Sequence, residues 1–347
     1  MLGQEKFVSI QFLFAFSLGK NTKISFLIGL KSIWTLYCIM CYEMEECVSA
    51  GHSCSMASIQ GEYMSQTKVT VLCENTAAGP LGLIGEHGFC VLIEKDDHRI
   101  LFDTGQGMAL ANNARLLNVD MSTIPTIVLS HGHYDHTGGL PAALHPPRQA
   151  QVYAHPDIFT AKYAQLHTAN GQQNVFIGLK YRPEYLEGTL QARFTFLREF
   201  RELVPGIFFS GEVPRKTAFE HPDTRLMVDR DGRLEIDPLW DDASLLIETD
   251  KGPVVIFGCA HAGAVNVLNH FAAQTGHTTF HAVIGGTHLG FMEGPGEQLQ
   301  ASIRAFDQYG LDLVAVSHCT GQLGAALCQQ HFQDRFAFAS AGWSVEF

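Results

Sequence analysis

Short apolar runs rich in β-branched residues, separated by polar and glycine-containing turns, dominate the chain from residue 69 onward. Such runs are typical of buried β-strands, because side chains that branch at Cβ pack well on a pleated surface. Apolar residues at helical spacing predict helices at 106–118 and from 137 to 144, and a third helix is predicted at 157–168. The predicted strands are 69–73, 89–94, 99–102, 126–129, 245–250, 254–258 and 313–318.

This pattern occurs twice along the chain. Residues 245–258 mirror residues 91–103, each as a strand, a turn and a returning strand, and 313–318 mirrors 127–131. Two such halves predict an α+β fold in which two β-layers pack face to face with helices outside, a four-layer αβ/βα sandwich. Between the halves, 145–240 is rich in aromatic and polar residues. We interpret it as an insertion that is either a lid and specificity element over the site or a structural elaboration.

The first 63 residues differ from the rest. They contain two apolar stretches, 7–18 and 24–42, the second interrupted by a lysine. Three explanations stay open: a start placed too far upstream, a membrane-associated segment, or a cleaved signal. On the first explanation Met64 is the natural beginning, and in each case the domain spans 64–347. We expect a cytoplasmic protein, or alternatively one anchored to a membrane through residues 1–63 alone.

Composition narrows the class of partner. The chain has 347 residues, 46% of them hydrophobic, which is ample for one large core. Its net charge of −12 disfavours nucleic acid, since no basic surplus exists to neutralise phosphates. Four of the nine cysteines lie before the likely domain, and the other five are scattered without zinc-finger spacing, which indicates mostly reduced thiols in a reducing compartment. A small-molecule substrate is the partner that remains.

Four potential metal ligands follow the predicted strand 126–129. They are His131, His133, Asp135 and His136. In extended backbone, side chains two residues apart point the same way, so His131 and His133 can bind one metal. If the chain turns into a helix near Asp135, then Asp135 and His136 face a second metal close to the first. Imidazole and carboxylate groups suit zinc, and also iron and manganese.

The order His131-x-His133-x-Asp135-His136 resembles the signature of the metallo-β-lactamase superfamily. The resemblance runs from about Val69 to about Trp343. It implies a dinuclear site with two divalent metal ions, of which zinc is expected first and iron or manganese are alternatives. It also implies that Asp103, after an early strand, supports the metal loop by hydrogen bonding.

Three later histidines each follow an apolar strand: His261, His288 and His318. We assign His131, His133 and His261 to one metal, and Asp135, His136 and His318 to the other. Many members of the superfamily place a metal-bridging carboxylate after the strand equivalent to 254–258, where this chain has Cys259. Whether Cys259, Asp241 or Asp242 takes the bridging role stays open.

Further fragments resemble a subgroup whose members are named 7,8-dihydropterin-6-methyl-4-(β-D-ribofuranosyl)aminobenzene-5′-phosphate synthase-like. The fragments are Glu86-His87-Gly88, Phe102-Asp103-Thr104-Gly105, Gly211-Glu212-Val213-Pro214-Arg215, Asp241-Asp242, Gly258-Cys259-Ala260-His261, Gly286-Thr287-His288-Leu289 and His318-Cys319-Thr320-Gly321. Arg215 and Lys216 are candidates for binding a substrate phosphate.

Three functions follow as hypotheses. The first is a metal-dependent hydrolase of an ester, lactone, amide or phosphoester, in which metal-activated water attacks. Asp135 would bind metal and orient the nucleophile, and the second metal or His288 would stabilise the developing oxyanion. The second is a synthase-type transferase that uses the metals as Lewis acids. The third is a non-catalytic, metal-dependent ligand-binding protein.

Overall fold

The computed structural model describes residues 14–17, 23–26, 66–168, 171–291 and 296–347. The chain divides into two units, Met1–Tyr63 and Met64–Phe347. In the first unit, β1 (Phe14–Ser17) and β2 (Lys23–Phe26) pair antiparallel. Most of the apolar stretches 7–18 and 24–42 lies outside the described residues. The three explanations for the first 63 residues therefore stay predictions. In the part of the chain that is described, none of the helices has both the length and the apolar character that crossing a membrane requires.

The second unit contains two seven-stranded sheets. In the first sheet, β3 to β5 are antiparallel neighbours, and β6 and β7 then continue parallel to β5. The spatial order is β10-β7-β6-β5-β4-β3-β20. Its strands are β3 (Thr67–Cys73), β4 (Cys90–Lys95), β5 (His98–Phe102), β6 (Thr126–Val128), β7 (Gln151–Ala154), β10 (Arg193–Phe196) and β20 (Ser344–Glu346).

The second sheet repeats this plan, with an antiparallel pair β15–β16 followed by parallel β17, β18 and β19. The spatial order is β11-β12-β15-β16-β17-β18-β19. Its strands are β11 (Arg201–Val204), β12 (Ile207–Phe209), β15 (Ser244–Ile247), β16 (Val254–Phe257), β17 (Ala282–Gly285), β18 (Leu313–Val316) and β19 (Phe336–Phe338). By position in the sheet, β17 and not β18 corresponds to β6. The predicted match of 313–318 with 127–131 was therefore displaced by one strand.

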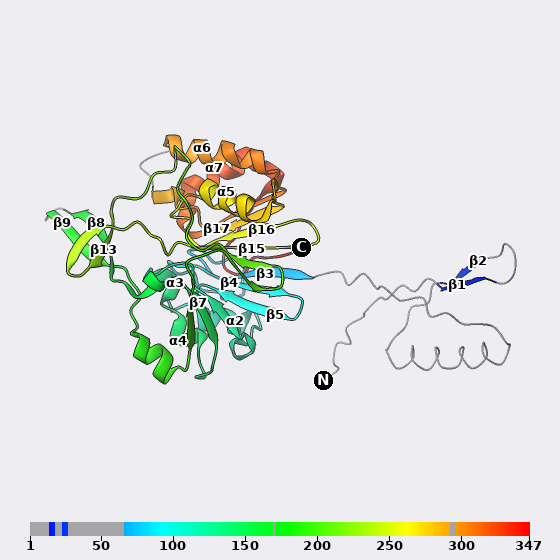
Figure 1. Cartoon of the computed structure of the whole chain (residues 1–347), viewed down its shortest axis with the longest axis horizontal. Coiled ribbons are helices and arrows are strands. Elements are labelled where there is room, and N and C mark those ends of the chain that lie inside the picture. The colour runs from blue at the N-terminus through cyan, green and yellow to red at the C-terminus, as the bar shows by residue number, and fades with distance from the viewer. Residues whose placement is uncertain (1–13, 18–22, 27–65, 169–170, 292–295) are drawn as a thin grey trace. The chain divides into compact units, whose positions relative to one another are not determined.

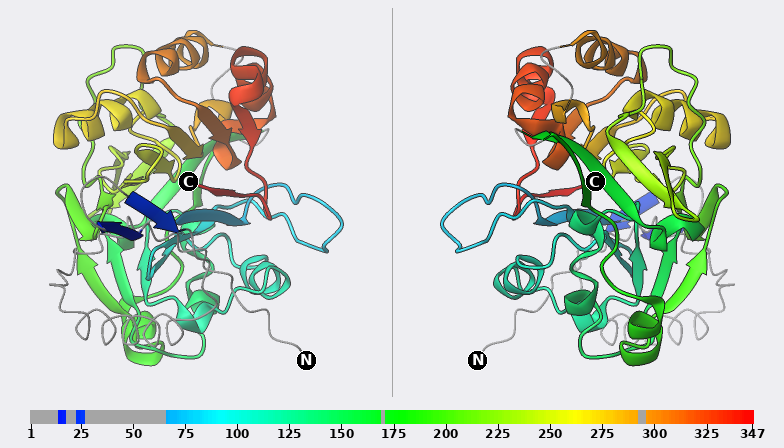
Figure 2. Two further views of the ribbon diagram at one scale, coloured as in Figure 1. Left: turned by 90° about the vertical axis from the view of Figure 1, so that its right-hand side faces the viewer. Right: turned by 90° about the vertical axis from the view of Figure 1, so that its left-hand side faces the viewer.

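Helices cover the outer face of each sheet, which gives the four layers of an αβ/βα sandwich (Figures 1 and 2). The first sheet carries α2 (Leu110–Leu116), α3 (Tyr134–Thr137) and α4 (Leu140–Ala143), and the second carries α5 (Ala264–Thr275), α6 (Glu297–Phe306) and α7 (Gly321–Phe332). Single turns of helix occur at Met121–Thr123, Pro156–Phe159, Glu184–Thr189, Leu289–Phe291, Asp307–Tyr309, His318–Thr320 and Gln333–Arg335.

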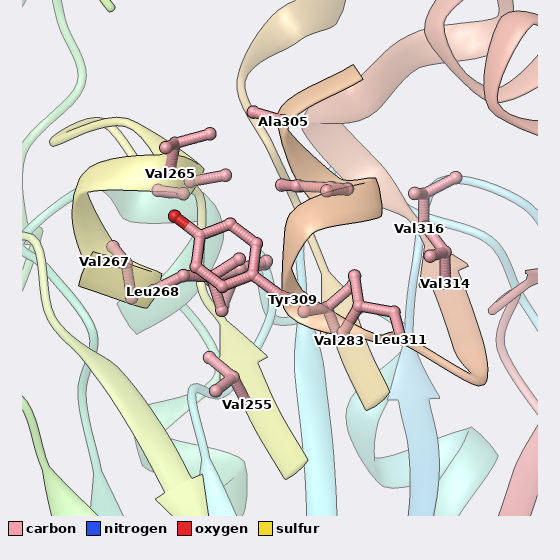
Figure 3. Packing of buried hydrophobic residues seen from close by; sticks show 14 of the residues in the cluster. Val255, Val265, Val267, Leu268, Val283, Ala305, Tyr309, Leu311, Val314 and Val316 are labelled. Carbon is pink, nitrogen blue, oxygen red and sulfur yellow. The ribbon is translucent and has the colours of Figure 1, made fainter. Parts of the chain in front are cut away.

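The alternation of side chains along each strand builds three apolar interfaces. In β16, Val254 and Ile256 face the core between the two sheets, whereas Val255 and Phe257 face the helices. Figure 3 shows the outer interface, where Val255, Val283 and Val314 of the second sheet lie beneath side chains such as Leu268 of α5. Burying both faces of the sheets fixes the strands rigidly, so the loops at their carboxyl ends are held in place.

The predicted insertion at 145–240 contains two kinds of element. β7, β10, β11 and β12 belong to the two main sheets. The remainder forms a separate four-stranded sheet of order β14-β13-β8-β9, which we call the small sheet. Its strands are β8 (Lys162–Thr168), β9 (Gly171–Phe176), β13 (Leu226–Arg230) and β14 (Arg233–Ile236).

The helix predicted at 157–168 is wrong, because most of this segment is β8. Ala, Gln and Leu in the segment favour a helix, but β8 pairs with both β13 and β9. The Tyr163 and Phe176 rings, opposite each other in this pairing, lie 5.6 Å apart. Such cross-strand contacts override a weak local propensity.

Candidate metal centre

The loop after β6 carries the first ligands. His131 and His133 lie in the extended segment, and α3 begins directly after His133, so Asp135 and His136 sit on a short helix. Gly132 between the two histidines leaves room for close packing, since a Cβ there would stand 2.7 Å from the carbonyl oxygen of Ile158. The sharp turn from extended chain to helix separates the four side chains into two pairs.

His131, His133 and His261 form the first donor group. His131 Nε2 lies 3.0 Å from His133 Nδ1 and 3.3 Å from His261 Nε2. Ser130 Oγ donates its proton to Asp103 and therefore accepts one from His131 Nδ1, which leaves a lone pair on Nε2. Burial lowers the pKa of His133 to about 3 and holds the pKa values of His131 and His261 well below their usual range.

Neutral imidazole nitrogens that converge in this way fit a divalent metal. Each neutral ring has a single N–H, and His131 uses its own on Ser130, so mutual hydrogen bonds cannot satisfy all three rings. Imidazole nitrogen is a preferred ligand of zinc, and three histidines with an open fourth position are typical of catalytic zinc sites. The residues present therefore fit the metal that the motif implies.

The second donor group surrounds one oxygen of Asp135. Asp135 Oδ2 lies 3.4 Å from His318 Nε2 and 3.9 Å from His136 Nε2. His318 Nε2 is buried and has no hydrogen-bond partner among the described residues. The fold thus brings together the three side chains that the sequence assigned to a second metal. His87 Nε2 lies 3.1 Å from the same oxygen, and this contact was not predicted from the sequence.

Asp103 and Glu74 hold the residues of the second donor group in place through hydrogen bonds. Asp103 accepts hydrogen bonds from the Ser130 backbone N–H at 2.7 Å, the Ser130 hydroxyl at 2.7 Å and His136 Nδ1 at 2.6 Å. Glu74 accepts the backbone N–H of His318 at 2.6 Å. Burial alone would lower the pKa of His136, but the Asp103 and Asp135 carboxylates outweigh it and raise that pKa to about 9.

Of the three candidates for the bridging role, only Cys259 lies among the donor atoms. Its Sγ is 3.1 Å from His136 Nε2 and within 4.8 Å of donors in both groups. Asp241 instead pairs with Lys162 and accepts the Gly132 N–H at 2.8 Å. Asp242 accepts the Ala262 N–H at 2.8 Å. Both carboxylates therefore brace the ligand loops.

A cavity opens onto both donor groups. Its walls combine the donor groups with apolar side chains of the small sheet. The lining includes His87, His133, Tyr134, Asp135, Ala164, Leu166, Ile177, Asp223, Arg225, Leu226, Cys259, His261, His288, Phe291, His318 and Cys319. Leu166 and Phe291 are 46% and 44% exposed, so the cavity offers uncovered apolar surface to a ligand.

His288 lies in the cavity wall with its ring 4.1 Å from that of His261. Its Nε2 is 3.2 Å from Asp223 Oδ2, and Arg225 donates to the same carboxylate. Burial opposes a charge on His288, yet the hydrogen bonds to Asp223 and Cys319 raise its pKa to about 9. His288 is thus placed to present a positive or hydrogen-bonding group next to the first donor group.

Arg215 and Lys216 do not line this cavity. Arg215 donates to the backbone carbonyls of His261 at 2.8 Å and Pro238 at 2.6 Å, so its guanidinium braces the His261 loop from behind. The Lys216 side chain is exposed on the surface. Both residues thus lie outside the cavity wall, where Arg225 is the arginine, and their binding of a substrate phosphate stays a prediction.

Two sheets packed face to face, with ligand side chains at the carboxyl ends of their strands, define a four-layer sandwich with a metal-binding type of site. A family model described as the metallo-beta-lactamase superfamily matches residues 83–318. The chain belongs to this superfamily.

Relatives extend the similarity over nearly the whole domain. The 7,8-dihydropterin-6-methyl-4-(beta-D-ribofuranosyl)-aminobenzene-5′-phosphate synthase of Methanocaldococcus jannaschii is 32% identical over 81% of this chain and 96% of its own length. The uncharacterized protein MJ0448 of the same organism is 34% identical over 64% of this chain and 79% of its own length. The crystal structure of Tm1679, a metal-dependent hydrolase of the beta-lactamase superfamily, covers 81% of this chain and 99% of that one, with 28% identity and a TM-score of 0.68.

Proposed function

We propose that this chain is a metal-dependent hydrolase that cleaves an ester, lactone, amide or phosphoester bond in a small molecule. The observation that carries the proposal is the set of neutral, buried nitrogens on His131, His133 and His261, beside the second group around Asp135. Divalent metals held there would lower the pKa of bound water from about 15.7 to about 7. We propose two such ions per chain, zinc before iron or manganese.

The chain's own residues supply orientation and polarity. Asp135 accepts hydrogen bonds at the mouth of the site and orients the nucleophile. His288, held by Asp223, faces the region beside His261 and donates to an oxygen on which negative charge develops. The apolar residues Leu166, Ile177 and Leu226 keep bulk water from the outer part of the cavity. A small organic molecule fits this lining better than a nucleic acid does.

Metal content and activity, measured on the same preparations, test the proposal. We expect about two metals per chain by mass spectrometry, and hydrolysis of at least one compound in a screen of esters, lactones, amides and phosphodiesters. The His131→Ala and His133→Ala double variant should lose the first metal and at least a thousandfold in rate. His281→Ala is the control, because His281 contacts Asp312 and does not line the cavity. Folded protein without metal, or full activity in the double variant, would contradict the proposal.

The second candidate is a synthase reaction of the kind named for the Methanocaldococcus jannaschii relative. The match over 96% of that protein favours it, and so does a cavity that pairs apolar walls with Arg225. In this case the metals would act as Lewis acids, without attack by water. Binding of a 7,8-dihydropterin to the metal-loaded chain, measured by fluorescence titration, would favour it. Hydrolysis of a compound in the screen, without any pterin binding, would exclude the synthase reaction and favour the hydrolase.

We also propose a cytoplasmic location. Cys73, Cys90, Cys259, Cys319 and Cys328 are free thiols within the described part of the chain, and free thiols are typical of a reducing compartment. Subcellular fractionation of cells that express the full chain tests this, since a cytoplasmic protein stays in the soluble lysate, whereas an exported one is found in the medium or with the membranes.

A further inference from the structure

Two histidines meet the same oxygen of Asp135. His87 Nε2 lies 3.1 Å and His318 Nε2 lies 3.4 Å from Asp135 Oδ2, and the two ring centroids are 5.1 Å apart. The three donor atoms lie within 4.8 Å of one another. Seen from the carboxylate alone, either ring is able to bind a metal or to donate a hydrogen bond. The nitrogen on the far side of each ring decides between these roles.

Asn75 lies behind both rings, and the backbone fixes the orientation of its amide. The N–H of Gly88 lies 3.3 Å from Asn75 Oδ1. A backbone N–H only donates, so the atom that faces it must be the amide oxygen. The same oxygen lies 2.8 Å from His318 Nδ1 and accepts a hydrogen bond from the Nδ1–H group. A neutral His318 therefore has its lone pair on Nε2, the buried atom that has no hydrogen-bond partner in the described residues.

The nitrogen of the same amide favours the opposite tautomer of His87. Asn75 Nδ2 lies 3.4 Å from His87 Nδ1. An amide nitrogen only donates, so His87 Nδ1 accepts and a neutral His87 has its proton on Nε2. That N–H points to Asp135 Oδ2 and donates to it. One amide thus gives His318 the tautomer of a metal ligand and His87 the tautomer of a hydrogen-bond donor.

The turn that carries His87 is built against Asp135. The N–H of Phe89 donates to the backbone carbonyl of Asp135 at 3.1 Å. A Cβ at Gly88 would stand 2.6 Å from that carbonyl oxygen, so only glycine permits this approach. Glu86, on the other side of His87, accepts the backbone N–H groups of Gln106, Gly107, Met108 and Ala109. The backbone itself therefore places His87 opposite the carboxylate.

We propose that His87 and Asn75 are positioning residues of the second donor group: Asn75 directs His318 toward the metal, and His87 holds Asp135 by an Nε2–H···Oδ2 hydrogen bond. This proposal rests on the metal centre of the proposed function. It adds two residues that position the ligands of the second metal to the predicted ligands Asp135, His136 and His318. Hydrogen bonds behind first ligands typically change metal affinity by about 10–100-fold.

Nitrogen-15 NMR of histidine-labelled, metal-free full chain tests the tautomers directly, with resonances assigned through His87→Gln and His318→Gln. We expect the Nε2–H form at His87 and the Nδ1–H form at His318. In Asn75→Asp, both oxygens of the new carboxylate accept hydrogen bonds, so neither His87 Nδ1 nor His318 Nδ1 faces a donor. His87 should therefore switch to the Nδ1–H form. Finding the Nδ1–H form at His87 in the wild type would overturn the proposal without bearing on hydrolysis.

Affinity for the second metal separates a positioning residue from a ligand. Glutamine keeps an N–H near the place of His87 Nε2 but is a poor ligand, so His87→Gln should stay within about threefold of the wild type while His87→Ala loses about 10–100-fold. The first metal should be unaffected in both, and His281→Ala should match the wild type. If Gln is as harmful as Ala, His87 is a ligand; if Ala has no effect, it has no role; both results overturn the proposal.

Discussion

At the scale of single residues, four residues near the candidate ligands have a left-handed backbone conformation. Asp103, Ala260, His288 and His318 are non-glycine residues with φ between 49° and 61°. Each follows one of the strands β5, β16, β17 and β18, at the edge where the cavity opens. Such conformations cost roughly 1–3 kcal/mol each and persist where surrounding contacts enforce them. At Asp103 these contacts are the three hydrogen bonds from Ser130 and His136.

Replacing Asp103 by asparagine therefore affects both stability and metal binding. The amide would turn an N–H toward a donor, either Ser130 or His136, inside a site that water does not reach. We expect Asp103→Asn to lose about 1–3 kcal/mol of unfolding free energy and about 10–100-fold in affinity for the second metal. Asp312→Asn is the control, since Asp312 also contacts a histidine but is 73% exposed. Denaturant unfolding and metal titration check the two effects, and an unchanged second affinity would show that Asp103 does not orient His136.

The two donor groups differ in how metal binding depends on pH. In the metal-free protein His136 has a pKa of about 9, because Asp103 and Asp135 outweigh the effect of burial. A metal that binds His136 Nε2 must displace a proton, so its affinity should rise about tenfold per pH unit from pH 6 to about 9. His133, whose pKa burial lowers to about 3, has no proton to displace in this range. Metal titrations at pH 6, 7 and 8 should give one steep and one flat dependence; equal slopes would contradict this account.

At the scale of elements, the sequence predicts what is local and misses what depends on remote pairing. Continuous apolar runs predicted β3, β4, β5, β6, β15, β16 and β18, because strands buried on both faces show little polar alternation. The edge strands β10 and β11 have no such run and are defined by their partners β7 and β12. In β8 the helix-favouring composition was misleading for the same reason.

The candidate site likewise combines residues that are close in sequence with contacts between residues that are far apart in sequence. The spacing of His131, His133, Asp135 and His136 within one loop was sufficient to predict that these side chains lie together as candidate ligands. Asn75 contacts His318 across 243 positions of sequence, and Lys162 contacts Asp241 across 79. No local pattern marks such pairs. His87 did have a signal, since it stood in a fragment shared with the subgroup, but only the fold shows that it faces Asp135.

The small sheet is joined to the metal loop by a buried lysine. In β8, Lys162, Ala164 and Leu166 share one face because side chains alternate. Ala164 and Leu166 line the cavity. Lys162 Nζ instead pairs with Asp237 at 2.6 Å and Asp241 at 2.9 Å. Asp241 in turn accepts the N–H of Gly132, between the first two ligands. The strand that lines the cavity thus also holds the loop that carries the candidate ligands.

Lys162→Met tests this link. Removing the cation leaves two buried carboxylates unpaired, which typically costs about 3–5 kcal/mol, and we expect the first metal to bind about tenfold more weakly. Lys95→Met is the matched control, because Lys95 is also buried but pairs with the exposed Asp96 and lies outside the cavity lining. Asp237→Asn, which removes one charge and little volume, serves if Lys162→Met does not fold. Equal losses of metal affinity in the Lys95 and Lys162 variants would show that Lys162 supports the fold without a specific effect on the loop.

At the scale of the whole second unit, neither half of the fold contains a complete donor group. The first half supplies His131, His133, Asp135 and His136, and the second supplies His261 and His318. The central core between the sheets, where Val91 and Ile93 meet Val254 and Ile256, sets the distance between the two sets of loops. The metal centre and the packing of the two halves are therefore parts of one cooperative structure.

Metal removal should for this reason lower the stability of the whole unit. A ligand that binds only the folded state stabilises it by RT ln(1 + [L]/Kd), about 2.7 kcal/mol when the free metal is 100 times Kd. For a unit of this size that corresponds to a Tm lower by roughly 5–10 °C after chelation. Restoring zinc should restore the Tm in the wild type, whereas the His131→Ala and His261→Ala variants, which lose a ligand from opposite halves, should respond much less. A Tm that chelation leaves unchanged would mean that the two sheets pack equally well without the ions, and that the loops tolerate the crowded nitrogens of His131, His133 and His261 through the contacts of the protein alone.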